Sequence, residues 1–287
     1  MSISPSYKQL YNEQGFVVIP NLIPEASFKE LKDAAERAIA RTRSGEWKLR
    51  RTVGSQFPPY DPDSPDAWGV QHIMHPDMNE PAFAKWYTSD PLVEAAEGLL
   101  GCTEGELQME LFNMLINPES HAFALRWHRD DVREKATEDE ERQALSIWHH
   151  GVQWNTFMPL RRPRSHQIPR TPEQRARSIT QDPPENPLDM PGALQVTLKP
   201  GETVFYNNNI LHCATYDPYQ KRATLHACMG DTRGGAIRAR NILQHGLFWM
   251  KEPPFRDTLN ERGKKMLERL LKLQESVNGD LGYSQVN

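Results

Sequence analysis

The chain has 287 residues, of which 38% are hydrophobic and 25% charged, with a formal net charge of −4 and a pI near 6.2. This composition supports a hydrophobic core, and a barrel or sandwich of this length is usually one domain. The acidic balance argues against nucleic-acid binding, which normally needs a basic excess. No stretch approaches the roughly 18 apolar residues of a membrane span, and the first residues lack the apolar core of a signal peptide. Three cysteines without CxxC spacing indicate free thiols in a reducing compartment, so we expect a cytoplasmic protein.

The first elements expected along the chain are a short strand and an amphipathic helix. Residues 15–20 are a β-branched run closed by proline, which is typical of a strand. Apolar residues then recur near the helical period over residues 24–39. The segment 43–80 is rich in Pro, Gly, Asp and Ser, and we interpret it as a long ordered loop resembling a lid. A second helix is expected over residues 91–100, with Gly101 as its C-cap.

The second half of the chain alternates strand patterns with turns. Residues 160–190 hold many Pro and Arg residues and are expected to be irregular, and an amphipathic helix near 257–277 closes the chain. Short strands joined by turns, with helices outside them, predict an α+β protein built on a jelly roll. Without a clear boundary, residues 1–287 are expected to form a single domain. The predicted strands lie within residues 107–117, 146–159, 193–198, 203–206 and 223–228.

A His-x-Asp triplet, His128-Arg129-Asp130, follows the strand pattern of residues 107–117. Residues i and i+2 of an extended segment point to the same side, so His128 and Asp130 can bind one ion together. His212, which lies 84 residues after His128, can supply a third ligand from a later strand. Two imidazoles and one carboxylate with open coordination positions form the ligand set of Fe(II) sites that activate O2.

Other histidines offer weaker alternatives. The triplet His75-Pro76-Asp77 lies in the Pro-rich 43–80 segment without an adjoining strand pattern, so His75 is interpreted as a loop residue or part of a substrate wall. His149 and His150 lack a nearby carboxylate in the sequence. His226 lies inside an apolar run, which favours a hydrogen-bonded core histidine.

Arg222 lies ten residues after His212 and beside the strand pattern of residues 223–228. A guanidinium close to such an iron can hold the distal carboxylate of 2-oxoglutarate through two parallel hydrogen bonds. By itself Arg222 would be interpreted as one half of a surface salt bridge, but its pairing with His212 favours the co-substrate role. The residues therefore predict Fe(II) as the cofactor and 2-oxoglutarate as the co-substrate.

An ordered set of segments resembles the phytanoyl-CoA dioxygenase family of iron- and 2-oxoglutarate-dependent oxygenases. The resemblance implies a double-stranded β-helix, a distorted jelly roll, with His128, Asp130 and His212 as the iron ligands and Arg222 as the residue that binds 2-oxoglutarate. It also implies that Asn113 and Gln153 lie against the co-substrate. The matching segments, within residues 7–250, are 15–20, 127–130, 152–156, 200–206, 210–212 and 221–224.

One segment departs from the family pattern. The family has an apolar strand leading into Pro-Gly-Ser-His, whereas this chain has Pro159-Leu-Arg-Arg-Pro-Arg-Ser-His166. Arg164 stands in place of the glycine, and an arginine does not adopt a positive φ without steric cost. We therefore expect this wall of the pocket to differ from that of relatives.

The expected function is oxidation of a small organic substrate by O2 and 2-oxoglutarate, with hydroxylation as the main outcome and desaturation or another oxidation as alternatives. Asp130 argues against halogenation, because related halogenases replace the carboxylate with a small residue. A Zn(II) hydrolase using the same three ligands is a second hypothesis, although it leaves Arg222 without a role. A non-catalytic binding protein of the same fold is a third, which the 159–166 segment keeps open. The substrate and the oligomeric state are not specified by the sequence.

Overall fold

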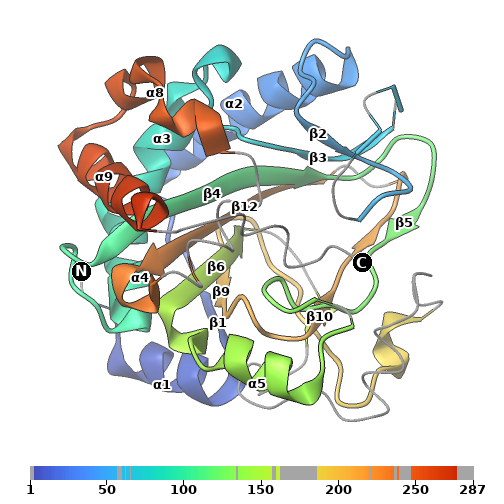
Figure 1. The fold of residues 1–287 in the computed structure, drawn as a ribbon. Helices are drawn as coiled ribbons and strands as arrows, with labels where there is room; N and C mark the ends of the chain where they lie inside the picture. Colours follow the sequence, from blue (N-terminus) through green and yellow to red (C-terminus); the bar gives the residue numbers. More distant parts are fainter. Residues whose placement is uncertain are drawn as a thin grey trace.

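The computed structural model describes residues 3–56, 60–61, 63–64, 66–133, 135–156, 160–161, 186–219, 222–235, 238 and 247–276, and every structural statement below concerns these residues. A seven-stranded antiparallel sheet crosses the middle of the molecule in the order β1-β9-β6-β12-β4-β3-β2 (Figure 1). Its strands are β1 (Phe16–Ile19), β2 (Arg50–Thr52), β3 (Ala67–Val70), β4 (Leu107–Ile116), β6 (Gly151–Thr156), β9 (Thr203–Tyr206) and β12 (Ala223–Asp231).

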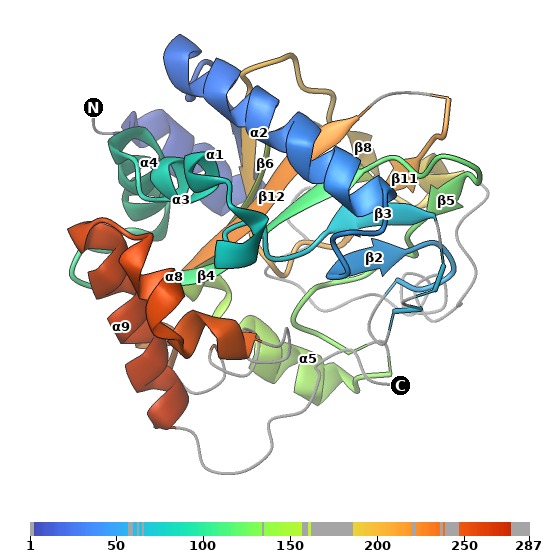
Figure 2. The same ribbon diagram turned by 90° about the horizontal axis from the view of Figure 1, so that it is seen from above.

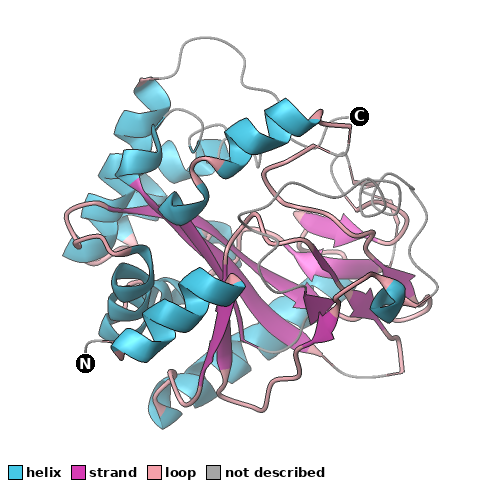
Figure 3. Ribbon diagram, turned by 90° about the horizontal axis from the view of Figure 1, so that it is seen from below, coloured by secondary structure: helices cyan, strands magenta, loops and turns pink. Residues whose placement is uncertain are grey.

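Shorter strands form a second layer. β7 (Leu160–Arg161) lies between β10 (His212–Cys213) and β8 (Leu194–Gln195), and β11 (Thr215–Tyr216) pairs with β5 (Phe123–Ala124). Figure 3 shows these short strands on one side of the large sheet and most of the helices on the other. The two layers of strands with flanking helices are the predicted α+β double-stranded β-helix, or jelly roll, so the predicted fold class is confirmed.

Amphipathic helices cover the outer face of the large sheet (Figure 2). Helix α9 packs on β4, helix α4 on β6 and helix α2 on β3. The helices are α1 (Pro5–Gln14), α2 (Glu25–Arg43), α3 (Pro81–Tyr87), α4 (Asp90–Leu100), α5 (Glu138–Leu145), α8 (Pro253–Asp257) and α9 (Glu261–Glu275). Short 3₁₀ helices are η1 (Pro76–Met78), η2 (Trp148–His150), η3 (Pro187–Asp189), η4 (Thr232–Gly234) and η5 (Leu247–Lys251).

A row of apolar residues crosses the helix-facing side of the sheet. Phe112, Ala227, Trp154 and Phe205 lie opposite one another on β4, β12, β6 and β9. The ring of Tyr87, at the end of α3, has its centroid 5.6 Å from that of Phe112 and 5.7 Å from that of Trp154. This row therefore belongs to the main hydrophobic core beneath the helices.

The adjacent row carries polar residues. One position away on each of these strands lie Asn113, His226, Asn155 and Val204, again opposite one another. Because successive residues of a strand point to opposite faces, this row points away from the helices and toward the short strands. The jelly roll thus has a polar interior between its two layers.

Several sequence predictions are settled by these elements. Helix α4 ends as predicted at Gly101, whose φ of 68° is the left-handed conformation of a C-cap. The closing helix is confirmed as α9, and the three cysteines are free thiols. The interpretation of residues 43–80 as a loop was wrong in part, because β2 and β3 within it extend the edge of the large sheet. Among the described residues, no helix is long and apolar enough to cross a membrane.

Candidate metal centre

His128 and His212 are brought together by the backbone. The two residues form an isolated antiparallel bridge in which each N–H donates to the carbonyl oxygen of the other at 2.9 Å. The N–H of Asp130 donates to the carbonyl of Asn208 at 3.2 Å, which extends the contact between the two segments. The ring centroids of the two histidines are 4.3 Å apart. His128 and His212 therefore lie in one site, although they are far apart in the sequence.

The ligand atoms of the three residues converge. Nε2 of His128 lies 3.4 Å from Oδ1 of Asp130, and Nε2 of His212 lies 3.7 Å from the same oxygen. All three candidate ligand atoms lie within 4.8 Å of one another, and this is the group of His, Cys, Asp and Glu side chains in the described residues that could hold a metal ion. The separations suit donors arranged around a single ion rather than donors bonded to each other.

Backbone carbonyls fix the tautomer of both histidines. Nδ1 of His128 lies 2.8 Å from the carbonyl oxygen of Arg126, and Nδ1 of His212 lies 2.8 Å from that of Ile210. A carbonyl oxygen only accepts hydrogen bonds, so Nδ1 must carry the proton in each ring. The lone pair of each neutral imidazole is then on Nε2, the atom that faces Asp130. Orientation of this kind is usual behind histidines that bind metals.

Asp130 is held by one further side chain. The amide nitrogen of Gln153 donates to Oδ2 of Asp130 at 2.7 Å, which leaves Oδ1 as the oxygen that faces both histidines. Burial raises the pKa of Asp130, but in the absence of metal a protonated His212 and the hydrogen bond and charge of a protonated His128 lower it more, and the pKa lies well below its usual value. The carboxyl group is therefore ionised at neutral pH. Oε1 of Gln153 is buried and has no hydrogen-bond partner among the described residues.

Arg222 lies just before β12, on the same strand face as Thr224 and His226. Its Nε donates to Oγ1 of Thr224 at 3.1 Å, and its NH1 donates to the carbonyl of Thr215 at 3.1 Å. The guanidinium carbon lies 4.9 Å from the ring centroid of Tyr216, a cation–π contact. Burial lowers the pKa of Arg222, although an arginine remains charged.

Arg222 also borders a cavity of about 700 Å³ between α2 and the start of β12. Phe28 and Ile39 of α2 and Leu225 of β12 give this cavity an apolar lining, and Arg43 lies at its rim. Arg222 therefore lines this cavity while its guanidinium contacts Thr224, Thr215 and Tyr216.

Asn155 and Tyr206, which the sequence analysis missed, lie beside the metal centre together with His226. Nδ1 of His226 lies 2.8 Å from Oδ1 of Asn155, and the hydroxyl of Tyr206 lies 3.3 Å from the same nitrogen. The ring of Tyr206 is 5.8 Å from that of His212, and the charge of His226 acts on Asp130. His226 is hydrogen-bonded as expected, but it lies on the interior face rather than in the apolar core. Alternating polar residues in β6 and β12 were the available signal.

Asn113 and His75 each accept a hydrogen bond from a backbone N–H group. Oδ1 of Asn113 accepts the backbone N–H of His72 at 2.8 Å, where His72 has a positive φ of 56°. Nδ1 of His75 accepts the N–H of Asp77 at 3.1 Å, and its ring lies 4.9 Å from that of Trp249. His75 thus caps η1, which contains Asp77, and neither residue is part of the His-Asp-His group.

The atypical segment is only partly visible. Leu160 and Arg161 form β7, which pairs with Cys213 and His212, so a two-residue strand is present where the family pattern has an apolar strand. Residues 159 and 162–166, including Arg164, lie outside the described residues.

A jelly roll with a His-Asp-His group between its sheets is the arrangement of the iron- and 2-oxoglutarate-dependent oxygenases. Residues 11–216 match the family profile described as phytanoyl-CoA dioxygenase (PhyH). The match covers more than half of the chain, and the chain belongs to this family. The resemblance inferred from the sequence motifs is therefore confirmed. A search of curated proteins found no match.

Solved structures with a similar fold include AviO1 from Streptomyces viridochromogenes Tue57, with a TM-score of 0.56 and 15% identity over 80% of this chain and 96% of that one. EctD from S. alaskensis with bound Fe has a TM-score of 0.57 and 16% identity over 81% and 78% of the two chains. The epimerase SnoN, in complex with Fe3+, alpha ketoglutarate and nogalamycin RO, has a TM-score of 0.53 and 15% identity over 79% and 83%. At these identities the similarity shows the fold.

Proposed function

We propose that this chain is an Fe(II)- and 2-oxoglutarate-dependent dioxygenase that oxidises a small organic molecule, with His128, Asp130 and His212 as the metal ligands. The observation that carries the proposal is the convergence of two Nε2 atoms and one carboxylate oxygen within 4.8 Å. Two neutral imidazoles and an ionised carboxylate are donors that suit Fe(II) and leave coordination positions for other molecules. Related structures contain Fe and 2-oxoglutarate, which supports the same pair here.

The residues of the chain have distinct tasks in this proposal. Bound iron with 2-oxoglutarate supplies the O2-dependent oxidation, which belongs to the cofactor rather than to the protein. The two backbone carbonyls behind His128 and His212 keep both rings in the tautomer that binds metal. Gln153 fixes the carboxylate of Asp130, so that one oxygen faces the ion.

Arg222 is proposed to bind the distal carboxylate of 2-oxoglutarate. A half-buried guanidinium at the start of β12 can form two charge-assisted hydrogen bonds with a carboxylate. Asn113 and Gln153 remain candidates for polar contacts with the co-substrate. Hydroxylation, the single-domain organisation of residues 1–287 and the cytoplasmic location remain predictions from the sequence.

The test is 2-oxoglutarate turnover by the purified chain. With Fe(II) and O2 we expect succinate to form, faster when the substrate is present, and we expect no turnover with Zn(II) in place of Fe(II). Metal-dependent ester or amide hydrolysis without 2-oxoglutarate consumption would instead support the hydrolase hypothesis. Metal binding without binding of 2-oxoglutarate under anaerobic conditions would refute the proposal.

A further inference from the structure

Two buried arginines flank the candidate metal ligands. Arg129 pairs with Glu141 of α5, and Arg238 pairs with Glu110 of β4; these four side chains are between 0% and 2% exposed. Removing two charges from water costs several kcal/mol per ion, so a buried pair is weak evidence of a stabilising role by itself. The role of the two arginines must therefore be inferred from the segments that they join.

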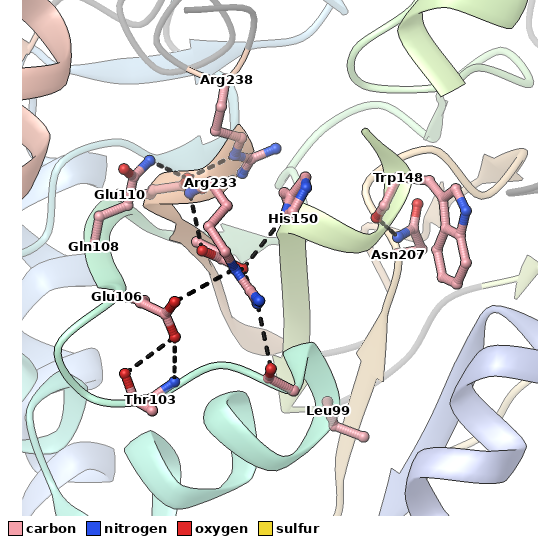
Figure 4. Close-up of polar contacts among 12 residues, drawn as sticks. Leu99, Thr103, Glu106, Gln108, Glu110, Trp148, His150, Asn207, Arg233 and Arg238 are labelled. Carbon is pink, nitrogen blue, oxygen red and sulfur yellow. Dashed lines mark hydrogen bonds and ion pairs between the residues drawn. The ribbon is translucent and has the colours of Figure 1, made fainter. Parts of the chain in front are cut away.

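Arg238 contacts both of the segments that meet at the metal centre. Its Nε and NH2 donate to the two carboxylate oxygens of Glu110, the first at 2.6 Å, and Figure 4 shows the two side chains together. Its NH1 lies 3.4 Å from Oδ2 of Asp131, the residue after the ligand Asp130. With the amide of Asn208 turned so that its oxygen faces the guanidinium, NH1 and NH2 both donate to it at 2.9 Å.

Arg129 makes the corresponding link on the other side of Asp130. Its Nε donates to Glu141 at 2.9 Å, and its NH1 donates to the backbone carbonyl of Asn209. Each arginine thus joins the 128–131 segment to the 207–209 turn. These are the same two segments that are paired by the His128–His212 bridge and by the hydrogen bond from Asp130 to the Asn208 carbonyl.

Glycines make room for the Arg238–Glu110 pair. A Cβ atom added at Gly151 would lie 2.6 Å from NH1 of Arg238, and one at Gly230 would lie 1.9 Å from Oε1 of Glu110. A Cβ at Gly234 would lie 3.1 Å from Cβ of Arg238. Glycines of β6, β12 and η4 therefore leave the space that the Arg238–Glu110 pair occupies, together with Gln108 and His150.

We propose that Arg238 and Arg129 are positioning residues that hold the 128–131 segment and the 207–209 turn in the register required for metal binding. Their effect is to place the ligands before the ion arrives, so that metal binding does not have to order two separate segments. This inference rests on the proposed metal site and adds the residues that preorganise it.

The test compares Arg238→Lys with Arg233→Lys. Lysine keeps the positive charge beside Glu110 and Asp131 but lacks the planar fork that reaches Glu110, Asp131 and Asn208 together. Arg233 is a matched control in the same region (Figure 4), because its contacts are with Asp231, Glu106 and the Gly101 carbonyl.

Metal affinity is measured by titration of the full chain with Co(II), followed by the visible absorption of the bound ion, and each metal-free variant is melted thermally. We expect Arg238→Lys to weaken Co(II) binding by about tenfold or more and to change the absorption band, as changes behind metal ligands usually do. Arg233→Lys should leave the affinity within about twofold of wild type by the same reasoning.

The outcomes separate the two proposals. A folded Arg238→Lys chain with wild-type Co(II) affinity and spectrum, whatever its melting temperature, would show a purely structural role and overturn this inference. If Arg238→Lys does not fold, Asn208→Ala decides, because it removes the side-chain acceptor but keeps the carbonyl that Asp130 uses; unchanged affinity there overturns the inference equally. A wild-type chain that binds no Co(II) or Fe(II) would refute the metal site itself.

Discussion

The two faces of the large sheet differ by a single step along each strand. Phe112, Trp154 and Phe205 on one face pack under the helices, whereas Asn113 and Asn155, one position away on β4 and β6, point into the jelly roll. Both rows lie on the same strands and share one register. The apolar side chains on the helix-facing side stabilise the fold, whereas the polar side chains on the interior side form the site. Substitutions on the two faces should therefore separate unfolding free energy from ligand affinity.

The largest effect is expected on the helix-facing side. Trp154 is fully buried among Tyr87, Phe112 and Phe205, so Trp154→Ala should lower the free energy of unfolding by about 3–5 kcal/mol. Urea unfolding of the metal-free chain measures this change. Trp154→Phe, which keeps most of the volume, should cost less. Metal affinity of the folded Trp154→Phe protein should match wild type, and a large loss of affinity would show that the two faces are not separable.

The next largest effect is expected at the metal centre. His212→Ala removes one of three ligands. A change behind the ligands typically lowers metal affinity by roughly ten- to a hundredfold, so the loss of a ligand should lower the affinity for Co(II) or Fe(II) by more than this. Turnover should be lost with it. His226→Ala is the matched control on the same face, and it should retain metal binding while losing about 1 kcal/mol of stability with its hydrogen bond to Asn155. A His226→Ala chain that folds but binds no metal would mean that the wrong histidine was assigned.

A smaller effect is expected for Arg222. Charge-assisted hydrogen bonds contribute about 1.5–3 kcal/mol, so Arg222→Ala should weaken 2-oxoglutarate binding by roughly ten- to a hundredfold. Arg222→Lys should recover only part of the affinity, because an ammonium lacks the planar fork. Iron affinity should be unchanged in both variants. Anaerobic titration of the Fe(II) protein with 2-oxoglutarate measures the effect.

Arg43→Ala is the control for this experiment. Arg43 borders the same cavity as Arg222 from the side of α2, and it pairs with Glu119 at 3.3 Å. If 2-oxoglutarate lies in the interior of the jelly roll, Arg43→Ala should leave its affinity unchanged. Equal losses for both arginines would place the co-substrate in the outer cavity, and equal affinities of Arg222→Ala and wild type would remove Arg222 from the site.

Local patterns in the sequence predicted what depends on local geometry. The period of two residues in a strand placed His128 and Asp130 on one side, and the left-handed preference of glycine marked the end of α4 at Gly101. The edge strand β2 and its neighbour β3 were missed because Pro, Gly and Asp around them dominate the composition of residues 43–80. Short edge strands with few residues carry little periodic signal.

Pairings that depend on the register of the whole sheet could not be predicted. Gln153 reaches Asp130 because β6 pairs with β9, and the residues that follow β9 pair with the segment that carries Asp130. Arg238 reaches Glu110 because β12, which precedes Arg238, pairs with β4. The residues next to Gln153 or Arg238 in the sequence do not indicate which side chain either of them contacts. The alternation of polar residues around His226 was visible in the sequence. Without the strand order, however, the apolar residues beside His226 favoured an assignment of this side chain to the core.

The smallest of the expected effects is at Gln153, and it decides between two roles for this side chain. The resemblance to the family implied contact with 2-oxoglutarate, whereas its amide donates to Oδ2 of Asp130 at 2.7 Å. Gln153→Met keeps a similar volume and removes the donor, so the hydrogen bond to Oδ2 of Asp130 is lost and its effect on the orientation of the carboxylate is tested. If the hydrogen bond sets the ligand orientation, metal affinity should fall by about tenfold while 2-oxoglutarate affinity at saturating metal stays near wild type.

The reverse pattern, with metal affinity retained and 2-oxoglutarate affinity reduced, would show that Oε1 of Gln153 faces the co-substrate and that the bond to Asp130 is secondary. Separate titrations with Co(II) and, on the metal-saturated protein, with 2-oxoglutarate distinguish the two because each measures one equilibrium alone.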